Sequence, residues 1–322
     1  MKRTAARLSA WILCAAAGGA LAQAYPVKPV RMLVPFAAGG AVDIVGRAMA
    51  QVLSTSMGQS FVVENRPGAG GSIGADAVAK AAPDGQTLLL ASGGAISIAP
   101  HLNPRLPYDA KKDFAAVALV GDTPMTIAVR ADSPYKALAD VLRDARARPG
   151  ALAYASTGNA TVSHLTGELL AQSAGIRLLH VPYKGAAPGV ADVAGGQVQA
   201  MIINIPSVMP LVKAGKLKAL AATSAKRPVS LPEVPTLAES GVAGYETLAW
   251  FGLLAPAKTA PSTVERLHAE LRKALAREDL RETLSRSGAE ASGIGPADFL
   301  TFIKSEIAKY GKVIRDAGIR VE

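Results

Sequence analysis

Cysteine and histidine are scarce in this sequence. Its 322 residues include one cysteine, Cys14, and four histidines, which stand far apart at His101, His164, His180 and His268. A chain with a single thiol forms no internal disulfide. Structural zinc sites need four Cys or His ligands at close spacing, so no metal is expected, and no motif calls for a cofactor.

After the first two dozen residues, no apolar run is long enough to span a membrane. The start itself has basic residues, then an apolar run over 8–21 that contains Cys14, then small residues around Ala22 and Ala24. This order is typical of a secretory signal peptide. A membrane anchor is the alternative, but the run is shorter than the roughly 20 residues that a spanning helix needs. We predict a cleaved signal peptide over 1–24, a mature chain without thiols, and a location in the periplasm.

The short motifs of common enzyme classes are missing as well. The sequence contains no G-x-x-x-x-G-K-[ST] phosphate loop and no G-x-S-x-G nucleophile motif. The glycines of 68–74 have the spacing G-x-G-x-x-x-G, which differs from the dinucleotide fingerprint. His164 and Glu168 share a helical face, but one such pair is a weak signal for a metal or acid–base site. We therefore predict no catalytic residues.

A modest excess of positive charge is present. The formal net charge is +10, and three of the basic residues lie in the predicted signal peptide. A basic surface can indicate a nucleic-acid or acidic membrane partner. Here, however, basic and acidic residues alternate, as over 262–286, and no Lys/Arg cluster is interleaved with aromatics. We expect no nucleic-acid partner and a solvated surface that attracts anions weakly.

The size and composition favour a two-domain globular protein. Half of the residues are apolar and 19% are charged, which is the composition of a well-buried fold. About 300 mature residues exceed the size at which one hydrophobic core keeps growing. Apolar strand-like runs alternate with amphipathic stretches, as in α/β proteins with mainly parallel sheets. Strands are expected at 30–35, 61–64, 87–92, 125–130, 151–155, 178–182, 200–204, 217–223 and 248–255, and helices at 41–57, 135–148, 161–174, 262–277, 279–287 and 296–317.

No Pro/Gly/Ser-rich linker separates two halves of the chain. Two domains joined by one linker would show such a joint, whereas domains joined by crossing strands need only short connections. We therefore expect crossings near 121–126 and 240–250. This divides the mature chain into a discontinuous lobe 1, formed by 25–122 and 247–322, and a lobe 2, formed by 123–246.

The loop after the first predicted strand could hold a ligand, because ligands of open α/β sheets bind beyond the carboxyl ends of strands. Its paired Gly39 and Gly40 let the backbone approach a ligand, and the helix that follows offers N–H groups to an anion. Phe36 and Ala38 belong to the same loop. Asp43 is either a ligand contact or an anion that stabilises the helix start, and we include it among the candidate contacts.

Three further strand ends carry polar residues. Ser92 follows the third predicted strand and is a hydroxyl donor or a simple cap. Ser156, Thr157 and Asn159 form a dense set of uncharged donors before the helix at 161–174, beyond what a single helix cap requires.

Two more candidate contacts follow later strands. Tyr183, next to Lys184, comes after the strand at 178–182 and is either a ligand contact or a core residue. Asn204 ends the strand at 200–204.

The motifs at these loops resemble those of the substrate-binding proteins of tripartite tricarboxylate transporters, the Bug-type receptors. The resemblance extends along the mature chain. It rests on Pro35-Phe36-x-x-Gly39-Gly40-x-x-Asp43, Val63-Glu64-Asn65-Arg66-Pro67-Gly68-Ala69-Gly70-Gly71, Ala82-Pro83-Asp84-Gly85, Ser156-Thr157-Gly158-Asn159 with Ser163-His164-Leu165, Val181-Pro182-Tyr183-Lys184-Gly185, Lys213-Ala214-Gly215-Lys216-Leu217 and Val234-Pro235-Thr236-Leu237.

The resemblance implies a two-lobed periplasmic binding fold that holds a small carboxylate between its lobes through backbone N–H groups, hydroxyls and waters. The loop 36–43 and Ser92 would serve from one lobe, and 156–159, His164 and Asn204 from the other, with His164 in contact with the ligand or just behind it. The implied partners are integral-membrane transporter subunits, and we expect a monomer whose lobes close around the ligand. A ligand-presenting sensor, or a hydrolase or isomerase of small acids, remains an alternative.

The sequence departs from the family pattern at Gln199 and Ile203, where an acidic residue is frequent. Loss of an acid at 203 would remove a partner for an amino group. This difference favours a plain carboxylic acid, including one with an apolar or aromatic body, over an amino acid.

Overall fold

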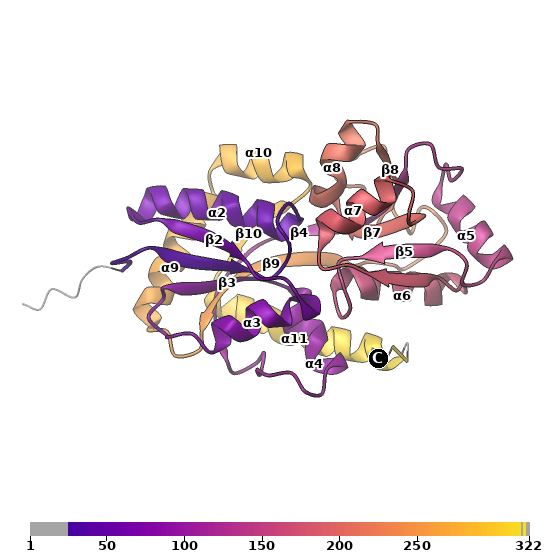
Figure 1. Ribbon diagram of the computed structural model, residues 1–322. Helices are drawn as coiled ribbons and strands as arrows, with labels where there is room; N and C mark the ends of the chain where they lie inside the picture. Colours follow the sequence, from indigo (N-terminus) through magenta and orange to yellow (C-terminus); the bar gives the residue numbers. More distant parts are fainter. Residues whose placement is uncertain (1–24, 317, 320–322) are drawn as a thin grey trace, which may run out of the picture.

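A computed structural model describes residues 25–316 and 318–319, with only the backbone at 286 and 287 (Figure 1). The predicted signal peptide, including Cys14, lies outside the described residues. Ten strands form one continuous hydrogen-bonded network, in the order β2-β1-β3-β9-β4-β7-β5-β6, with β8 and β10 both paired to β4. Helices cover this network on both faces. The network forms two lobes, and the long strands β4 and β9 lie where the lobes join.

The first lobe contains the N-terminal third and the C-terminal quarter of the chain. Its outer strands β1, β2 and β3 are parallel. Its elements are β1 (Val30–Val34), α2 (Ala41–Met57), β2 (Phe61–Asn65), a 3₁₀ turn (Ala69–Gly71), α3 (Ser72–Ala79), β3 (Thr87–Ser92), a π-helical turn (Gly94–Ile98), α4 (Ala99–Leu102), α9 (Pro261–Leu275), α10 (Glu278–Ser287), β10 (Glu290–Ile294) and α11 (Pro296–Asp316).

Alternation along the strands decides which helix packs on which face, because successive side chains of a strand point to opposite sides. Met32 and Val34 of β1 pack in a core with α2 and α9, whereas Leu33 between them packs in a second core with α3 and α11. Both faces are therefore buried, and the sequence of β1 is almost continuously apolar, as expected for a covered parallel strand.

The second lobe repeats this arrangement. Its strands β5, β6 and β7 are parallel to one another, and β7 and β8 run antiparallel to β4. Helices α5 and α6 cover one face of the sheet and helices α7 and α8 the other. The elements are α5 (Leu138–Ala147), β5 (Ala153–Ser156), α6 (Val162–Ala174), β6 (Leu179–Pro182), α7 (Ala186–Ala194), β7 (Ala200–Asn204), α8 (Ile205–Lys213) and β8 (Leu217–Ala222).

The chain crosses between the lobes twice, along β4 (Phe114–Arg130) and where it returns to lobe 1 at the start of β9 (Leu248–Pro256). From Phe114 to Pro124, β4 pairs with β9, and from Met125 onward it pairs with β7 of the second lobe. The predicted two-lobed α/β fold with crossing strands is confirmed. The change of partners falls within the predicted crossing at 121–126, and we keep the predicted lobe boundaries as a proposal.

The first half of β4 and all of β10 were not predicted. β4 continues without interruption through Gly121 and Pro124. A Cβ atom at Gly121 would lie 2.2 Å from the carbonyl oxygen of Glu290, so this glycine allows β10 to approach β4. Among the described residues, no helix is long and apolar enough to cross a membrane.

Candidate functional site

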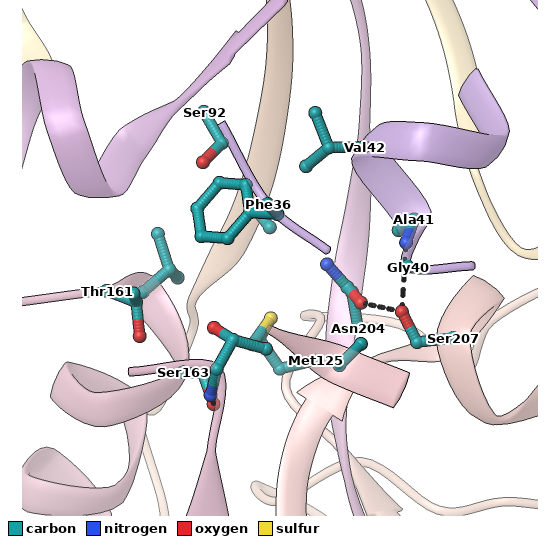
Figure 2. A pocket seen from close by; sticks show the side chains of 14 residues that line it. Phe36, Gly40, Ala41, Val42, Ser92, Met125, Thr161, Ser163, Asn204 and Ser207 are labelled. Atoms are coloured by element: carbon teal, nitrogen blue, oxygen red, sulfur yellow. Dashed lines mark hydrogen bonds between the residues drawn. The ribbon is translucent and has the colours of Figure 1, made fainter. Parts of the chain in front are cut away.

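A cavity lies where the two lobes meet, and its volume including its opening to solvent is about 440 Å³ (Figure 2). Residues of the loop after β1 and of β3 form one side, and residues from the N-terminal ends of lobe 2 helices form the other. Met125 of β4 and Ala249 of β9 contribute from the crossing strands. The cavity is therefore built from both lobes and from the strands that join them.

Four helices begin at this cavity. The lining includes Gly40 to Val42 at the start of α2, Thr161 to Ser163 at the start of α6, Ala186 at the start of α7, and Asn204 and Ser207 at the start of α8. The first N–H groups of a helix lack partners inside the helix, and each helix N-terminus carries a partial positive charge. Of the described residues that line the cavity, none has a charged side chain. The site can therefore hold an anion through helix ends and hydroxyls alone.

A hydrogen bond joins the lobes at the edge of the cavity. The N–H of Ala41, the first residue of α2, donates to Ser207 Oγ at 3.0 Å, and Ser207 Oγ donates to Asn204 Oδ1 at 2.7 Å. Figure 2 shows this chain of contacts opposite Ser92 and Phe36. Ser207 was not predicted. Its position three residues after Asn204, in the first turn of the next helix, is the signal that could have indicated it.

Asp43 points away from the cavity and holds the glycine loop in shape. Its Oδ2 accepts from the Gly39 N–H and from Arg47 Nε, each at 3.0 Å, and its Oδ1 accepts from Asn65 Nδ2 at 2.9 Å. Asn65 Nδ2 also donates to the carbonyl of Phe36. Burial alone would raise the pKa of Asp43, but the hydrogen bonds from Arg47, Gly39 and Asn65 outweigh it and keep the pKa below 3.8. Asp43 lines neither cavity described here, so we propose an anchoring role in place of the predicted contact.

Replacement of Asp43 distinguishes these two roles. Asp43→Asn turns one acceptor into a donor that faces N–H groups, and we expect it to lower the free energy of unfolding by roughly 1–3 kcal/mol, because a buried charged hydrogen-bonding group is lost. Arg47→Met removes only the exposed partner and should cost less than about 1 kcal/mol. Thermal unfolding and ligand titration of both variants provide the measurement. A large loss of affinity at unchanged stability would instead identify Asp43 as a ligand contact.

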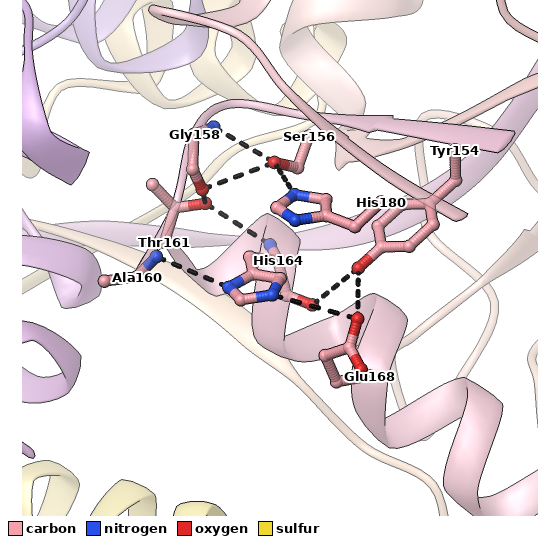
Figure 3. Close-up of polar contacts among 8 residues, drawn as sticks. All are labelled: Tyr154, Ser156, Gly158, Ala160, Thr161, His164, Glu168 and His180. Carbon is pink, nitrogen blue, oxygen red and sulfur yellow. Dashed lines mark hydrogen bonds and ion pairs between the residues drawn. The ribbon is translucent and has the colours of Figure 1, made fainter. Parts of the chain in front are cut away.

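The loop from Ser156 to Thr161 forms the wall of lobe 2. Ser156 Oγ is fully buried, accepts from the Gly158 N–H at 3.1 Å and contacts His180 Nε2 at 2.6 Å (Figure 3). Thr157 lines the cavity, and its N–H donates to Ser163 Oγ at 3.2 Å. Thr161 caps α6 by accepting from the N–H of His164. Ser156 thus shapes the loop, while Thr157 and Thr161 face the cavity.

A second cavity lies beside the first and shares Phe36 and Thr157 with it. Its volume including open solvent is about 500 Å³. Its walls are the glycine-rich turn 68–71 of lobe 1 and, from lobe 2, residues 157–159 and 182–184. The turn 68–71 is therefore part of the cleft between the lobes. In the sequence, its glycines had only been compared with the dinucleotide fingerprint, which they do not match.

The predicted contacts divide into three groups by position. Phe36, Gly40, Ser92, Thr157 and Asn204 line the first cavity, and Asn159 and Tyr183 line the second. Ala38, Gly39, Asp43, Ser156 and His164 line neither. The lining residues Thr161 and Ser163 were missed because they lie at the start of the predicted helix 161–174, and Ser207 was missed because its partner lies in the other lobe.

The two departures from the family pattern lie away from the cavities. Ile203 is fully buried in the core of lobe 2, and Gln199 accepts from the N–H of Ala153 through Oε1. Neither residue can therefore exclude an amino group from the ligand, and the preference against amino acids that we drew from Ile203 loses its basis. Among the described residues, no group of three or more His, Cys, Asp or Glu side chains is placed to hold a metal ion.

A two-lobed α/β protein with an anion-compatible cavity between its lobes has the architecture of a solute-binding receptor. The model of the tripartite tricarboxylate transporter family receptor matches residues 45–319, and this chain belongs to that family. Protein BugT of Bordetella pertussis is 37% identical over 302 residues, which cover 94% of this chain and 93% of BugT. The resemblance to Bug-type receptors is thereby confirmed.

Solved structures match over almost the whole fold. Rpa4515 of R. palustris, solved with adipate, has a TM-score of 0.90 at 37% identity and covers 92% of this chain and 99% of its own. MatC from Rhodopseudomonas palustris, solved with bound malate, has a TM-score of 0.86 at 33% identity and covers 90% of this chain and 100% of its own. Two similar proteins thus bind dicarboxylates.

Proposed function

We propose that this chain is a periplasmic receptor that binds a small carboxylate between its lobes, without chemical conversion, and delivers it to the membrane subunits of a tripartite tricarboxylate transporter. The observation that carries this proposal is the meeting of four helix N-termini, from both lobes, at one cavity whose described lining residues include no charged side chain. Membership in the receptor family and the dicarboxylates bound by Rpa4515 and MatC support the same function.

Helix ends suit a receptor that must release its ligand. A buried anion needs compensation for the water it loses, and first-turn N–H groups of helices provide it with little reorganisation. The Ala41 N–H would first have to leave Ser207 Oγ. Each helix end contributes roughly 0.3–1 kcal/mol at exposed sites and up to about 2 kcal/mol in partly buried ones. Because α2 and the helices α6, α7 and α8 belong to different lobes, the full attraction exists only when the lobes are together. The ligand therefore stabilises the closed form.

The second cavity offers room for the far end of a longer acid. Lys184 is the one charged side chain among the described residues that line it, and no ion pair or hydrogen bond ties Lys184 to another described side chain. We expect Lys184→Ala to weaken the binding of long dicarboxylates such as adipate by roughly 2- to 5-fold, as for an exposed ion pair, and to leave short monocarboxylates such as propionate unaffected. Calorimetric titration measures both. Lys213→Ala, at the far end of α8, is the control, and equal losses in both Lys variants would exclude a local contact.

The proposed function is tested by a thermal-shift screen of the mature protein. The panel contains mono- and dicarboxylates, aromatic acids, amino acids and neutral sugars, with the amide of each acid as a matched neutral control. A ligand that binds only the native state raises the unfolding temperature. At a free ligand concentration of 100 times Kd it adds about 2.7 kcal/mol to the free energy of unfolding. We expect at least one acid, and not its amide, to stabilise the protein and to be recovered unchanged. A sugar as the ligand, or conversion of the acid, would contradict the proposal.

A further inference from the structure

Two of the four histidines lie stacked beneath the loop from Ser156 to Thr161 (Figure 3). The rings of His164, on α6, and His180, on β6, have centroids 4.1 Å apart and planes 10° from parallel. Tyr154 of β5 stacks on His180, with ring centroids 5.1 Å apart. His164 is only 6% exposed. The pair lies outside both cavities. It therefore supports the loop from Ser156 to Thr161 but does not line the proposed ligand site.

Each ring contacts this loop through one nitrogen. His180 Nε2 lies 2.6 Å from Ser156 Oγ, which in turn accepts from the Gly158 N–H. His164 Nδ1 accepts from the Ala160 N–H at 3.4 Å. Ala160 has φ 58°, in the left-handed region that a residue with a side chain seldom adopts. The contact with His164 therefore supports the backbone at its least favourable point.

Protonation would reverse the contact at Ala160. A neutral imidazole offers one ring nitrogen as an acceptor, whereas both nitrogens of the cation are donors. With a proton on Nδ1, His164 could no longer accept the hydrogen bond from the Ala160 N–H, because two N–H donors would then point at each other. At His180 the hydroxyl proton of Ser156 could turn to the Gly158 carbonyl, 3.3 Å away, but a charge there would lie against the ring of His164.

The surroundings favour neutral rings. Burial, and then the neighbouring His164, lower the pKa of His180 to about 3. Burial also lowers the pKa of His164 below 6.5, although the Glu168 carboxylate, 3.8 Å from its Nε2, favours the charged form. Glu168 itself accepts from the Tyr154 hydroxyl at 2.8 Å, and the buried Tyr245 hydroxyl donates to the Thr166 carbonyl on the same helix. The Glu168 carboxylate thus favours protonation of the pair, whereas the burial of both rings and their closeness to each other oppose it.

We propose that His164 and His180 are a proton-sensitive pair that positions the loop 156–161 for binding only while both rings are neutral. In a receptor, acidification would then loosen the wall that carries Thr157 and Asn159 and weaken ligand binding. That consequence for the ligand rests on the proposed function, whereas the effect on the loop does not.

The direction of the pH effect follows from linkage. The ordered loop keeps the rings neutral, and a released loop lets them return to the ordinary pKa of about 6.5. The stabilisation of the ordered loop is complete above that value and is lost as the pH falls below it. Each unit below about 6.5 raises the population of the released loop by up to tenfold for each ring that takes up a proton.

The test uses the complete mature protein without ligand. Carbon-labelled histidine follows the four rings by NMR from pH 8 down through the midpoint of their titrations, and amide spectra follow Gly158 and Ala160. We expect the His164 and His180 rings to titrate with an apparent pKa below 6.5, and the two amide signals to move with the same midpoint. Rings that titrate at the ordinary value, or amide signals that stay fixed while the rings titrate, would overturn the proposal.

Variants separate the proton effect from simple support. Asn at 164 keeps an acceptor near the place of Nδ1, and Gln at 180 keeps a polar group near the place of Nε2, yet neither titrates. His164→Asn should therefore hold the amide signal of Ala160 at its neutral position throughout the pH range, and His180→Gln should do the same for Gly158. His268→Gln, on α9 of lobe 1, is the matched control and must leave both titrations unchanged. An unaltered titration of Ala160 in His164→Asn would exclude the role of this ring.

Failure of the proposed function gives a different result. If no acid of the thermal-shift panel binds, the carboxylate receptor is excluded, while the ring and amide titrations still decide the role of the histidine pair. If an acid binds, its affinity in the native protein should fall with the same midpoint as the ring and amide titrations, and the double variant His164→Asn/His180→Gln should lose this dependence. An affinity that stays constant while the pH passes through the midpoint of the ring titrations would contradict coupling to the ligand site. A strong acid such as an alkanesulfonate, where it binds, is a second probe whose own charge does not change over this range.

Discussion

Replacing Gly40 with valine should lower carboxylate affinity by roughly 10- to 100-fold without destabilising the ligand-free protein. Gly40 caps α2 with an ordinary extended backbone, so a side chain causes no strain there. A Cβ atom at this position would lie 3.2 Å from Cβ of Ala186 in the opposite lobe. The two further methyl groups of valine must push the lobes apart. An overpacking penalty of roughly 1–3 kcal/mol would then oppose closure, and about 1.4 kcal/mol corresponds to tenfold in affinity.

The same substitution six residues later provides a matched control. Gly46 lies on the same helix, but its added Cβ would meet Leu90 and Val34 at 3.1 Å, inside lobe 1. We expect Gly46→Val to lower the unfolding temperature and to change affinity little, the opposite of Gly40→Val. Titration and thermal unfolding of both variants provide the comparison. If Gly40→Val also loses stability in the absence of ligand and keeps its affinity, Gly40 is a packing residue and the lobes do not close at this contact.

Truncation of Trp250 to alanine should cause the largest loss of stability of any single change at the crossing strands, roughly 3–5 kcal/mol. Trp250 lies on β9, is 1% exposed and pairs with Asp122 of β4. Its ring makes edge contacts with Phe299 and Phe302 of α11, at centroid distances of 5.7 and 5.9 Å. The cavity left behind would loosen α11 from both crossing strands. At roughly 2–4 °C per kcal/mol for a large domain, the unfolding temperature should fall by roughly 10 °C.

Trp250→Phe is the control for shape. The indole Nε1 has no hydrogen-bond partner among the described residues, so phenylalanine loses volume but no hydrogen bond. We expect a cost clearly smaller than that of the alanine variant. Equal losses in the two variants would show that the indole N–H, rather than the packing, stabilises the crossing. Differential scanning calorimetry of both variants without ligand measures the difference.

Local features of the fold were accessible from the sequence. The strand at Val30–Val34 and the helix at Ala41–Met57 follow from an apolar run and a helical apolar stripe. The predicted ends of the helices at 41–57 and 161–174 are confirmed, because Gly58 and Gly175, which follow them, have left-handed φ values of 68° and 62°. Their signals involve residues close together in the chain. β10 was missed because its exposure alternates between exposed and half-buried positions, which gives a weak apolar pattern.

The site was predictable only in part, for a different reason. Phe36, Gly40 and Thr157, which line the cavity, were predicted as contacts because a strand end followed by a helix start is a common place for a ligand site. Ser207 was not, because its importance depends on the N–H of Ala41, 166 residues away and in the other lobe. Asp43 shows the converse. A carboxylate in a ligand loop suggested a contact, but it accepts hydrogen bonds from Gly39 and Arg47, each four residues away, and from the more distant Asn65.

Closure around a carboxylate can be measured directly as a distance between the lobes. The mature chain as predicted contains no cysteine, so Ile73→Cys on α3 and Leu179→Cys on β6, both about half exposed in the native protein, can carry the only two spin labels. Pulsed electron paramagnetic resonance then measures the distance between the two spin labels with and without the acid that gives the largest thermal shift. We expect a broad distribution that shortens and narrows with the acid and stays unchanged with its amide. An acid that binds tightly and leaves the distance unchanged would contradict a receptor that closes its lobes around a carboxylate.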